Sequence, residues 1–119
     1  MTQDIRRLHT NARMSKIVSY GGLVFLAGQT SSGTDIVGIE EQTREVLRRV
    51  DHLLAEAGTD KSRLLSVTIF LRDMSDFAAM NGVWETWLPP GVAPARATLQ
   101  ASIASKHLLV EMTVIAAGP

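Results

Sequence analysis

The sequence predicts an α+β fold, with one mixed β-sheet and two helices packed on one face. Two stretches carry apolar residues at helical spacing, over residues 39–57 and 75–87. Five or six shorter extended stretches surround them, in the core order strand, helix, strand, helix, strand, strand. With 119 residues, 45% of them apolar and 20% charged, the chain has room for one ordinary core. We therefore expect a single domain over residues 1–119.

Charge and composition exclude several classes of protein. Twelve basic and twelve acidic residues cancel, so the chain offers no general attraction for nucleic acid or anionic lipid. The absence of cysteine excludes disulfides and thiolate chemistry. His9, His52 and His107 lack the spacing of metal ligands, and we expect no metal. The N-terminus does not resemble a signal peptide and no apolar run could span a membrane, so we expect a cytoplasmic protein with no membrane partner.

The first third of the chain predicts three strands. Residues 5–9 and 16–20 are short extended segments, and the Gly21–Gly22 pair after the second indicates a tight hairpin. Residues 23–27 are apolar without alternation, which is typical of a strand buried on both faces. A loop rich in Ser, Thr and Gly follows over residues 30–38.

A long amphipathic helix is predicted over residues 39–57, and Gly58 is placed to end it. Its apolar stripe consists of Ile39, Thr43, Val46, Leu47, Val50, Leu53, Leu54 and Ala57. Two pairs of opposite charge, four residues apart, support the polar side: Glu40 with Arg44, and Glu45 with Arg49.

The second half predicts a strand over 64–72, a helix over 75–87, and strands over 94–100 and 108–116. The Pro89–Pro90 pair stops this helix. The expected inward faces are Leu65, Val67, Ile69 and Leu71 in the strand, and Phe77, Met80, Trp84 and Trp87 in the helix. Apolar residues remain on the sheet face without helices, and another copy of the chain would cover them. We therefore expect a homo-oligomer with its ligand cleft between subunits.

Arg96 is the residue that points most directly to function. It lies in a segment with period-two alternation and shares a face with Thr98, Gln100 and Ser102. The other face, which could lie close against a helix, consists of Ala95, Ala97, Leu99 and Ala101. A guanidinium in a covered strand needs an anion, and a small carboxylate ligand would suit it. A structural ion pair or a solvated strand face explains the same pattern.

Glu111 is the candidate partner of Arg96. If the last two strands form an antiparallel hairpin around residues 103–104, Arg96 falls near Glu111, and both project from the face without helices. A cation that holds a substrate carboxylate and a carboxylate that orients water would form a hydrolytic pair. A cross-strand salt bridge is the alternative interpretation.

From residue 16 to the end, a series of short motifs resembles one known family. The motifs are GLVFLAGQ at 22–29, QT at 42–43 with VL at 46–47, LLAEAG at 53–58, IFLRDM at 69–74, DFAAMN at 76–81, PAR at 94–96 and VE at 110–111. In this order they resemble the Rid family of reactive intermediate deaminases, also called the YjgF or L-PSP endoribonuclease family.

The resemblance implies a chorismate-mutase-like α+β fold and a homotrimer with ligand clefts at the subunit interfaces. Active members hydrolyse enamines and imines, of the 2-iminobutanoate and 2-iminopropanoate type, to 2-oxo acids and ammonia without a cofactor. The resemblance places Arg96 at the arginine that grips the substrate carboxylate and Glu111 at the glutamate that positions water. Asn81 and Gly28 match pocket positions that bind substrate.

The chain departs from active members at three pocket positions. Met14 stands where they have Tyr, Ala27 where many have Ser, and Thr98 where they have Cys. Two hydroxyls are thereby replaced by apolar groups, so we expect faster hydrolysis of larger apolar imino acids. A non-catalytic module that binds small carboxylate metabolites in the same cleft is the alternative function. RNA cleavage is a third, and the neutral charge argues against it.

Overall fold

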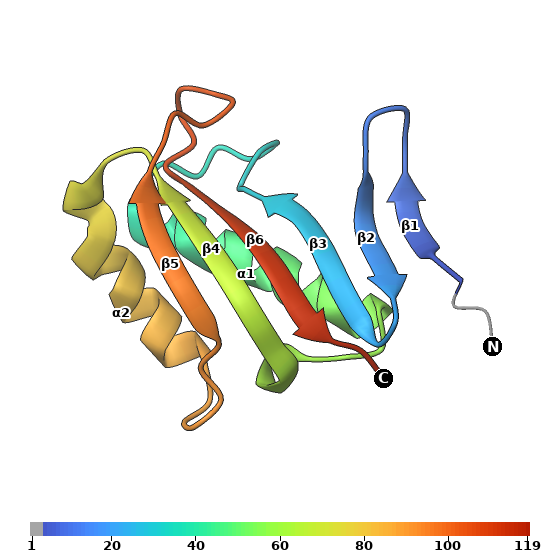
Figure 1. Cartoon of the computed structure of the whole chain (residues 1–119). Helices are drawn as coiled ribbons and strands as arrows, with labels where there is room; N and C mark the ends of the chain where they lie inside the picture. The colour runs from blue at the N-terminus through green and yellow to red at the C-terminus, as the bar shows by residue number, and fades with distance from the viewer. Residues whose placement is uncertain (1–3) are drawn as a thin grey trace.

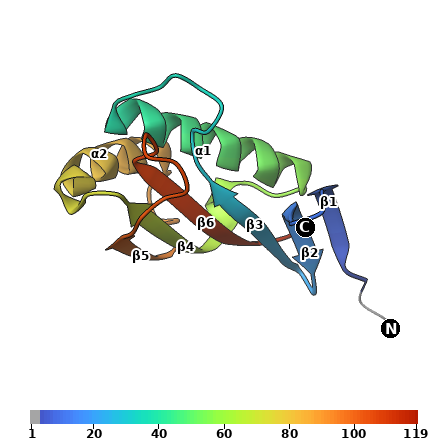
Figure 2. The same ribbon diagram turned by 90° about the horizontal axis from the view of Figure 1, so that it is seen from above.

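A computed structural model describes residues 4–119, so the first three residues of the predicted domain lie outside the described part. One six-stranded sheet has the order β1-β2-β3-β6-β4-β5. Its strands are β1 (Arg6–Thr10), β2 (Ser15–Tyr20), β3 (Leu23–Gln29), β4 (Leu64–Leu71), β5 (Ala95–Gln100) and β6 (Val110–Ala117). The helices α1 (Ile39–Glu56) and α2 (Phe77–Trp87) lie on the same face of the sheet, which confirms the predicted architecture (Figures 1 and 2).

The position of β6 differs from the expectation. It pairs antiparallel with β3 on one side and with β4 on the other, while β5 runs parallel to β4 at the sheet edge. The predicted antiparallel hairpin of β5 and β6 is therefore wrong. Every second residue of β6 is buried and the rest are half-buried, so this strand suits the centre of the sheet. Residues 101–109 carry the chain past the end of β4 from the edge to the centre (Figure 1).

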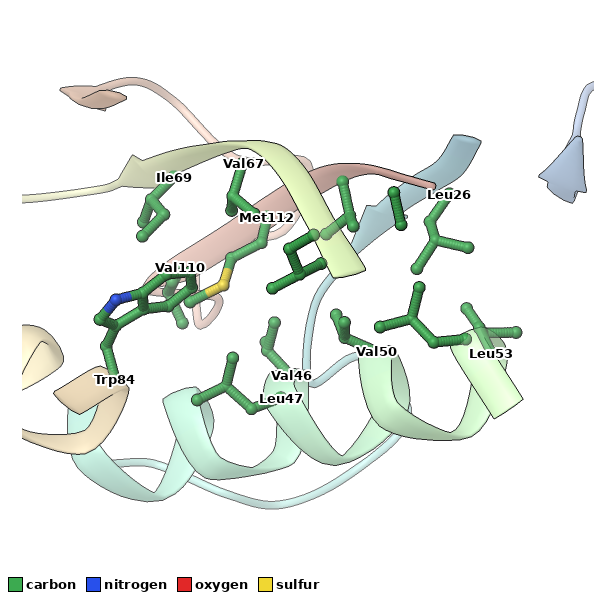
Figure 3. Packing of buried hydrophobic residues seen from close by; sticks show 14 of the residues in the cluster. Leu26, Val46, Leu47, Val50, Leu53, Val67, Ile69, Trp84, Val110 and Met112 are labelled. Atoms are coloured by element: carbon green, nitrogen blue, oxygen red, sulfur yellow. The ribbon is translucent and has the colours of Figure 1, made fainter. Parts of the chain in front are cut away.

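The hydrophobic core lies between α1, α2 and the sheet. Figure 3 shows side chains of α1 pointing at the strands, with Trp84 of α2 beside the side chains of β4 and β6. The most completely buried of these residues include Val46, Val50, Leu54, Val67, Ile69, Leu71, Met80, Val110 and Met112. The stripe that the sequence predicted for α1 therefore forms the inner face of this helix.

The C-terminal end and the polar side of α1 follow the sequence. After Ala57, Gly58 takes a φ of +83°, a left-handed conformation that only glycine adopts without strain, and its N–H donates to the carbonyl of Ala55 at 3.0 Å. Both predicted ion pairs are present, with a distance of 2.7 Å between Glu45 and Arg49 and 3.9 Å between Glu40 and Arg44.

Two predicted inward residues face outward instead. Leu65 is 45% exposed because the register of β4 against β6 shifts between Leu64 and Ser66, which turns Leu64 inward. Phe77 at the start of α2 is exposed, and Val83 takes its place in the core. Asp73 begins this segment: its side chain accepts from the N–H of Ser75 at 2.8 Å in the short 3₁₀ turn before α2.

The sheet face opposite the helices exposes large apolar side chains. β3 alternates between buried and exposed residues, so within one chain it is covered on one face only, unlike the expected strand buried on both. The exposed apolar side chains of this face are Tyr20, Leu23, Phe25, Leu65 and Leu99, from four different strands. We call them the open apolar face. Within residues 4–119, no helix has the length and hydropathy needed to span a membrane.

Candidate functional site

Arg96 lies on the helix side of the sheet. It pairs with Val67 of β4, which is buried under the helices, and partners in adjacent strands point to the same side. Leu99 pairs with Phe70 and is exposed on the open face. The expectation that the alanine face of this strand packs on a helix is therefore wrong. The small residues of β5 face away from the helices, and the guanidinium faces α2.

The Arg96 guanidinium lies over the ring of Trp84, with 5.3 Å between Cζ and the ring centroid. Both residues line a cavity of about 460 Å³. Among residues 4–119, the Arg96 guanidinium takes part in no ion pair and in no side-chain hydrogen bond. Within that range it therefore has no carboxylate partner. The other lining residues are Asn81, Glu85, Leu88, Pro89, Pro90, Gly91, Ala93 and Pro94.

Two buried polar atoms near this cavity also lack a partner. They are Oδ1 of Asn81, which lines the cavity, and Oγ1 of Thr98, which lies two residues after Arg96 on the same face of β5. Buried polar atoms are normally hydrogen-bonded, because an unmade bond costs about 1–3 kcal/mol. A guanidinium without an anion and two unpaired oxygens make this cavity the best candidate for a polar ligand.

Glu111 and Gly28 form a second group, on the open face. Glu111 pairs with Phe70 across β6 and β4, and its carboxylate lies over the backbone of Gly28 on β3. A Cβ added to Gly28 would overlap Oε2 of Glu111 and lie 3.0 Å from its Cδ. Residues 26–29 of β3 also shift register against β6. The glycine is therefore explained by the close approach of this carboxylate.

One chain does not bring the two groups together. Arg96 pairs with Val67 and Glu111 with Phe70, three residues further along β4 and on its other edge. Standard strand spacings then separate the two backbones by roughly 14 Å, and the side chains point to opposite faces. Met14 lies still farther away, in the turn between β1 and β2 at the opposite end of the strand order from β5.

Two buried side chains that the sequence did not single out fix the loop before Glu111. Gln42 on α1 is 0% exposed; its Nε2 donates to the carbonyl of His107 at 2.8 Å and its Oε1 accepts from the N–H of Leu109 at 2.8 Å. The Arg72 guanidinium donates to carbonyls of the same loop, at Ile103, Ser105 and Leu108. A glutamine in an apolar helix stripe was the available signal for such a role.

A second hollow, of about 320 Å³, is lined by Lys16, Gln29, Arg48, Arg49, His52 and Leu53, but its guanidinium groups are already matched. Arg49 donates to Glu45 and to two carbonyls of the 30–38 loop, while Arg48 binds Glu45 through two atoms. The Arg48 hydrogen bond is the main reason that the pKa of Glu45 falls to about 2.

His52, which lines this second hollow, shares the Glu56 carboxylate with His9. Nε2 of His9 lies 2.7 Å and Nε2 of His52 lies 3.1 Å from the Glu56 carboxylate, and the His9 hydrogen bond is the main cause that lowers the pKa of Glu56. Among residues 4–119, no group of three or more His, Cys, Asp or Glu side chains is arranged to hold a metal ion.

Comparison with known proteins agrees with this fold. The family model described as endoribonuclease L-PSP matches residues 4–118. A RutC family protein of Haemophilus influenzae is 40% identical over 112 residues, which cover 94% of this chain and 97% of the relative. The RutC family protein YoaB of Escherichia coli is 37% identical over 113 residues, covering 95% and 97%.

Solved structures show the same likeness. The crystal structure of a YjgF family member from Neisseria meningitidis superimposes with a TM-score of 0.93 at 41% identity, covering 98% of this chain and 96% of the other. A Rid family protein of unknown function from Yersinia pestis gives a TM-score of 0.84 at 29% identity, covering 91% and 90%. The family model and these relatives span nearly the whole chain, so the protein belongs to the Rid family, also named the YjgF or endoribonuclease L-PSP family.

Proposed function

We propose that this protein is a deaminase that hydrolyses 2-imino acids, and the enamines in equilibrium with them, to 2-oxo acids and ammonia. The observation that carries the proposal is the Arg96 guanidinium, which meets no anion among residues 4–119 and faces a cavity of about 460 Å³. A planar guanidinium binds a carboxylate through two parallel hydrogen bonds. A 2-imino acid supplies that carboxylate next to the reacting carbon.

The second half of the proposed site comes from another subunit. Because Arg96 and Glu111 face opposite sides of one chain, a shared cleft needs two chains. The open apolar face supports an assembly, since such a surface is costly to leave in water. The proposed assembly is a homotrimer, in which Arg96, Asn81 and Thr98 of one subunit face Gly28, Glu111 and Met14 of the next.

The proposed reaction needs only water and correct placement. Arg96 holds the carboxylate, and Glu111 accepts a hydrogen bond from a water molecule at the imine carbon. The water oxygen forms a bond to that carbon and gives a carbinolamine. In this addition the nitrogen takes the first proton of the water. The carbinolamine hydroxyl then releases its proton and the nitrogen takes a second one, so the carbon–nitrogen bond breaks, ammonia leaves with the bonding pair, and the oxygen becomes the carbonyl of the 2-oxo acid. Orientation is the main contribution of the protein, because free imines already hydrolyse in water.

The direct test generates imines in place with an amino-acid oxidase, in the presence of a nucleophile that traps the free imine. The share of product that escapes the trap reports the rate of hydrolysis. Arg96→Ala should reduce the acceleration at least about a hundredfold. Arg96→Lys should recover little of it, because an ammonium keeps the charge but not the two parallel hydrogen bonds.

Arg44→Ala is the matched control, since it removes the same charge from an exposed helix position that lies outside the Arg96 cavity. It should behave as the unmodified protein does. Binding of a 2-oxo acid at Arg96 without acceleration of any imine would replace the proposal by the non-catalytic binding module. Full activity in Arg96→Ala would remove both interpretations.

A further inference from the structure

The face of Trp84 under Arg96 is held rigidly. Trp84 is 6% exposed, and its ring packs against that of Trp87 with centroids 5.4 Å apart and planes tilted by 49°. Nε1 of Trp87 donates to Oδ2 of Asp51 on α1 at 2.8 Å. Two helices therefore fix the aromatic pair, and the pair provides a firm surface for the guanidinium.

Other arginines of this chain are fixed in a different way. Arg49 uses three nitrogen atoms to bind Glu45 and two carbonyls. Arg72 donates to three carbonyls of the 101–109 loop. Such contacts hold a guanidinium in place by consuming its N–H donors. An aromatic face attracts the cation and consumes none of them.

We infer that Trp84 is a positioning residue for ligand binding: its indole face holds the Arg96 guanidinium at the cavity and leaves the N–H donors to the ligand carboxylate. The inference rests on the proposed role of Arg96. A carboxylate in place of the ring would fix the guanidinium equally well but would compete with the ligand for the same donors. Without the ring, Arg96 would lose side-chain freedom on binding, and affinity would fall.

Three variants separate the aromatic face from simple packing. Trp84→Leu keeps an apolar side chain without an aromatic face, and it should weaken 2-oxobutanoate binding by about tenfold. Trp84→Phe restores a smaller aromatic face and should bind within about threefold of the unmodified protein. Trp87→Phe keeps a ring beside Trp84 and removes only the hydrogen bond to Asp51, so it should weaken binding clearly less than Trp84→Leu does. For imine hydrolysis, Trp84→Leu should raise KM and leave kcat nearly unchanged, because the carboxylate is held before and during the reaction.

A ring-current signal gives a readout that does not depend on activity. The side-chain proton resonances of Arg96, assigned by their loss in Arg96→Ala, should be shifted upfield in the unmodified protein and in Trp84→Phe but not in Trp84→Leu. Calorimetry should measure 2-oxobutanoate binding to each folded variant. Wild-type affinity in Trp84→Leu, or equal losses in Trp84→Leu and Trp84→Phe, would overturn the inference. Wild-type binding by Arg96→Ala would instead overturn the proposed function.

Discussion

Gly28→Ala tests whether the placement of the Glu111 carboxylate matters. The added Cβ would overlap Oε2 of Glu111 and lie 3.0 Å from Cδ, closer than the 3.4–4 Å of ordinary contact. The carboxylate must therefore retreat by about 1 Å, and a displacement of that size in a reacting group costs about a hundredfold in rate. The moving group is the end of a flexible side chain, so the melting temperature should stay within about 5 °C of the original.

The assay is the partitioning of imine between hydrolysis and trap, measured for Gly28→Ala, Glu111→Gln and the double variant. If the alanine acts through Glu111, the double variant should be no slower than Glu111→Gln alone. Gly82→Ala is a matched control, because a Cβ at this glycine of α2 meets nothing within 4 Å. It should keep full activity. An active Gly28→Ala, or a double variant slower than Glu111→Gln, would refute the proposed role of the carboxylate.

Three further predictions concern specificity, acid stability and assembly. Each extra buried methylene of a substrate side chain contributes about 0.8 kcal/mol of binding. The imine derived from leucine should therefore have a higher kcat/KM than 2-iminopropanoate. A preference for the smallest imine would contradict this. The pKa of Glu45 is lowered to about 2 in the folded protein, so its charged carboxylate stabilises the folded state at pH values above its ordinary pKa of 4.5. Glu45→Gln should therefore lower the free energy of unfolding by about 1 kcal/mol at about pH 6. This value is discounted for solvent screening, because Arg48 is 67% exposed. In urea unfolding, the difference between variant and original should shrink as pH falls toward 2. Phe25→Asp on the open apolar face should lower the mass in sedimentation equilibrium, whereas an unchanged mass would exclude this face from the interface.

The helices were predictable because their stripes are long and regular. The stripe of α1 from Val46 to Leu54 is buried as its spacing predicts. The position of β5 was not predicted correctly, because the hairpin prediction assumed that strands consecutive in sequence pair with each other. The order β4, α2, β5 contained the opposite signal, since a helix between two strands permits parallel pairing and leaves β6 free to enter the centre.

The sequence nominated residues for the candidate site, but it did not predict how they are arranged in space. The need of a guanidinium for an anion pointed to Arg96. Glu111 was chosen from the family motifs and from a predicted hairpin of the last two strands, which the structure does not contain. Which face each side chain takes depends on strand register, because a shift of one residue reverses the faces of a whole strand. Trp84 was expected in the core, where it lies, but its contact with Arg96 required the position of β5 beside α2.

Mixed assembly of two inactive variants tests the central claim, that the site is shared between subunits. Arg96→Ala keeps Glu111, and Glu111→Gln keeps Arg96, so each variant alone should be inactive. After the two chains are unfolded together in equal amounts and refolded, about a quarter of the interfaces should pair an intact Arg96 with an intact Glu111 and recover about a quarter of the original activity. Recovery of no activity, from a mixture of normal mass and secondary structure, would contradict a site built between two chains.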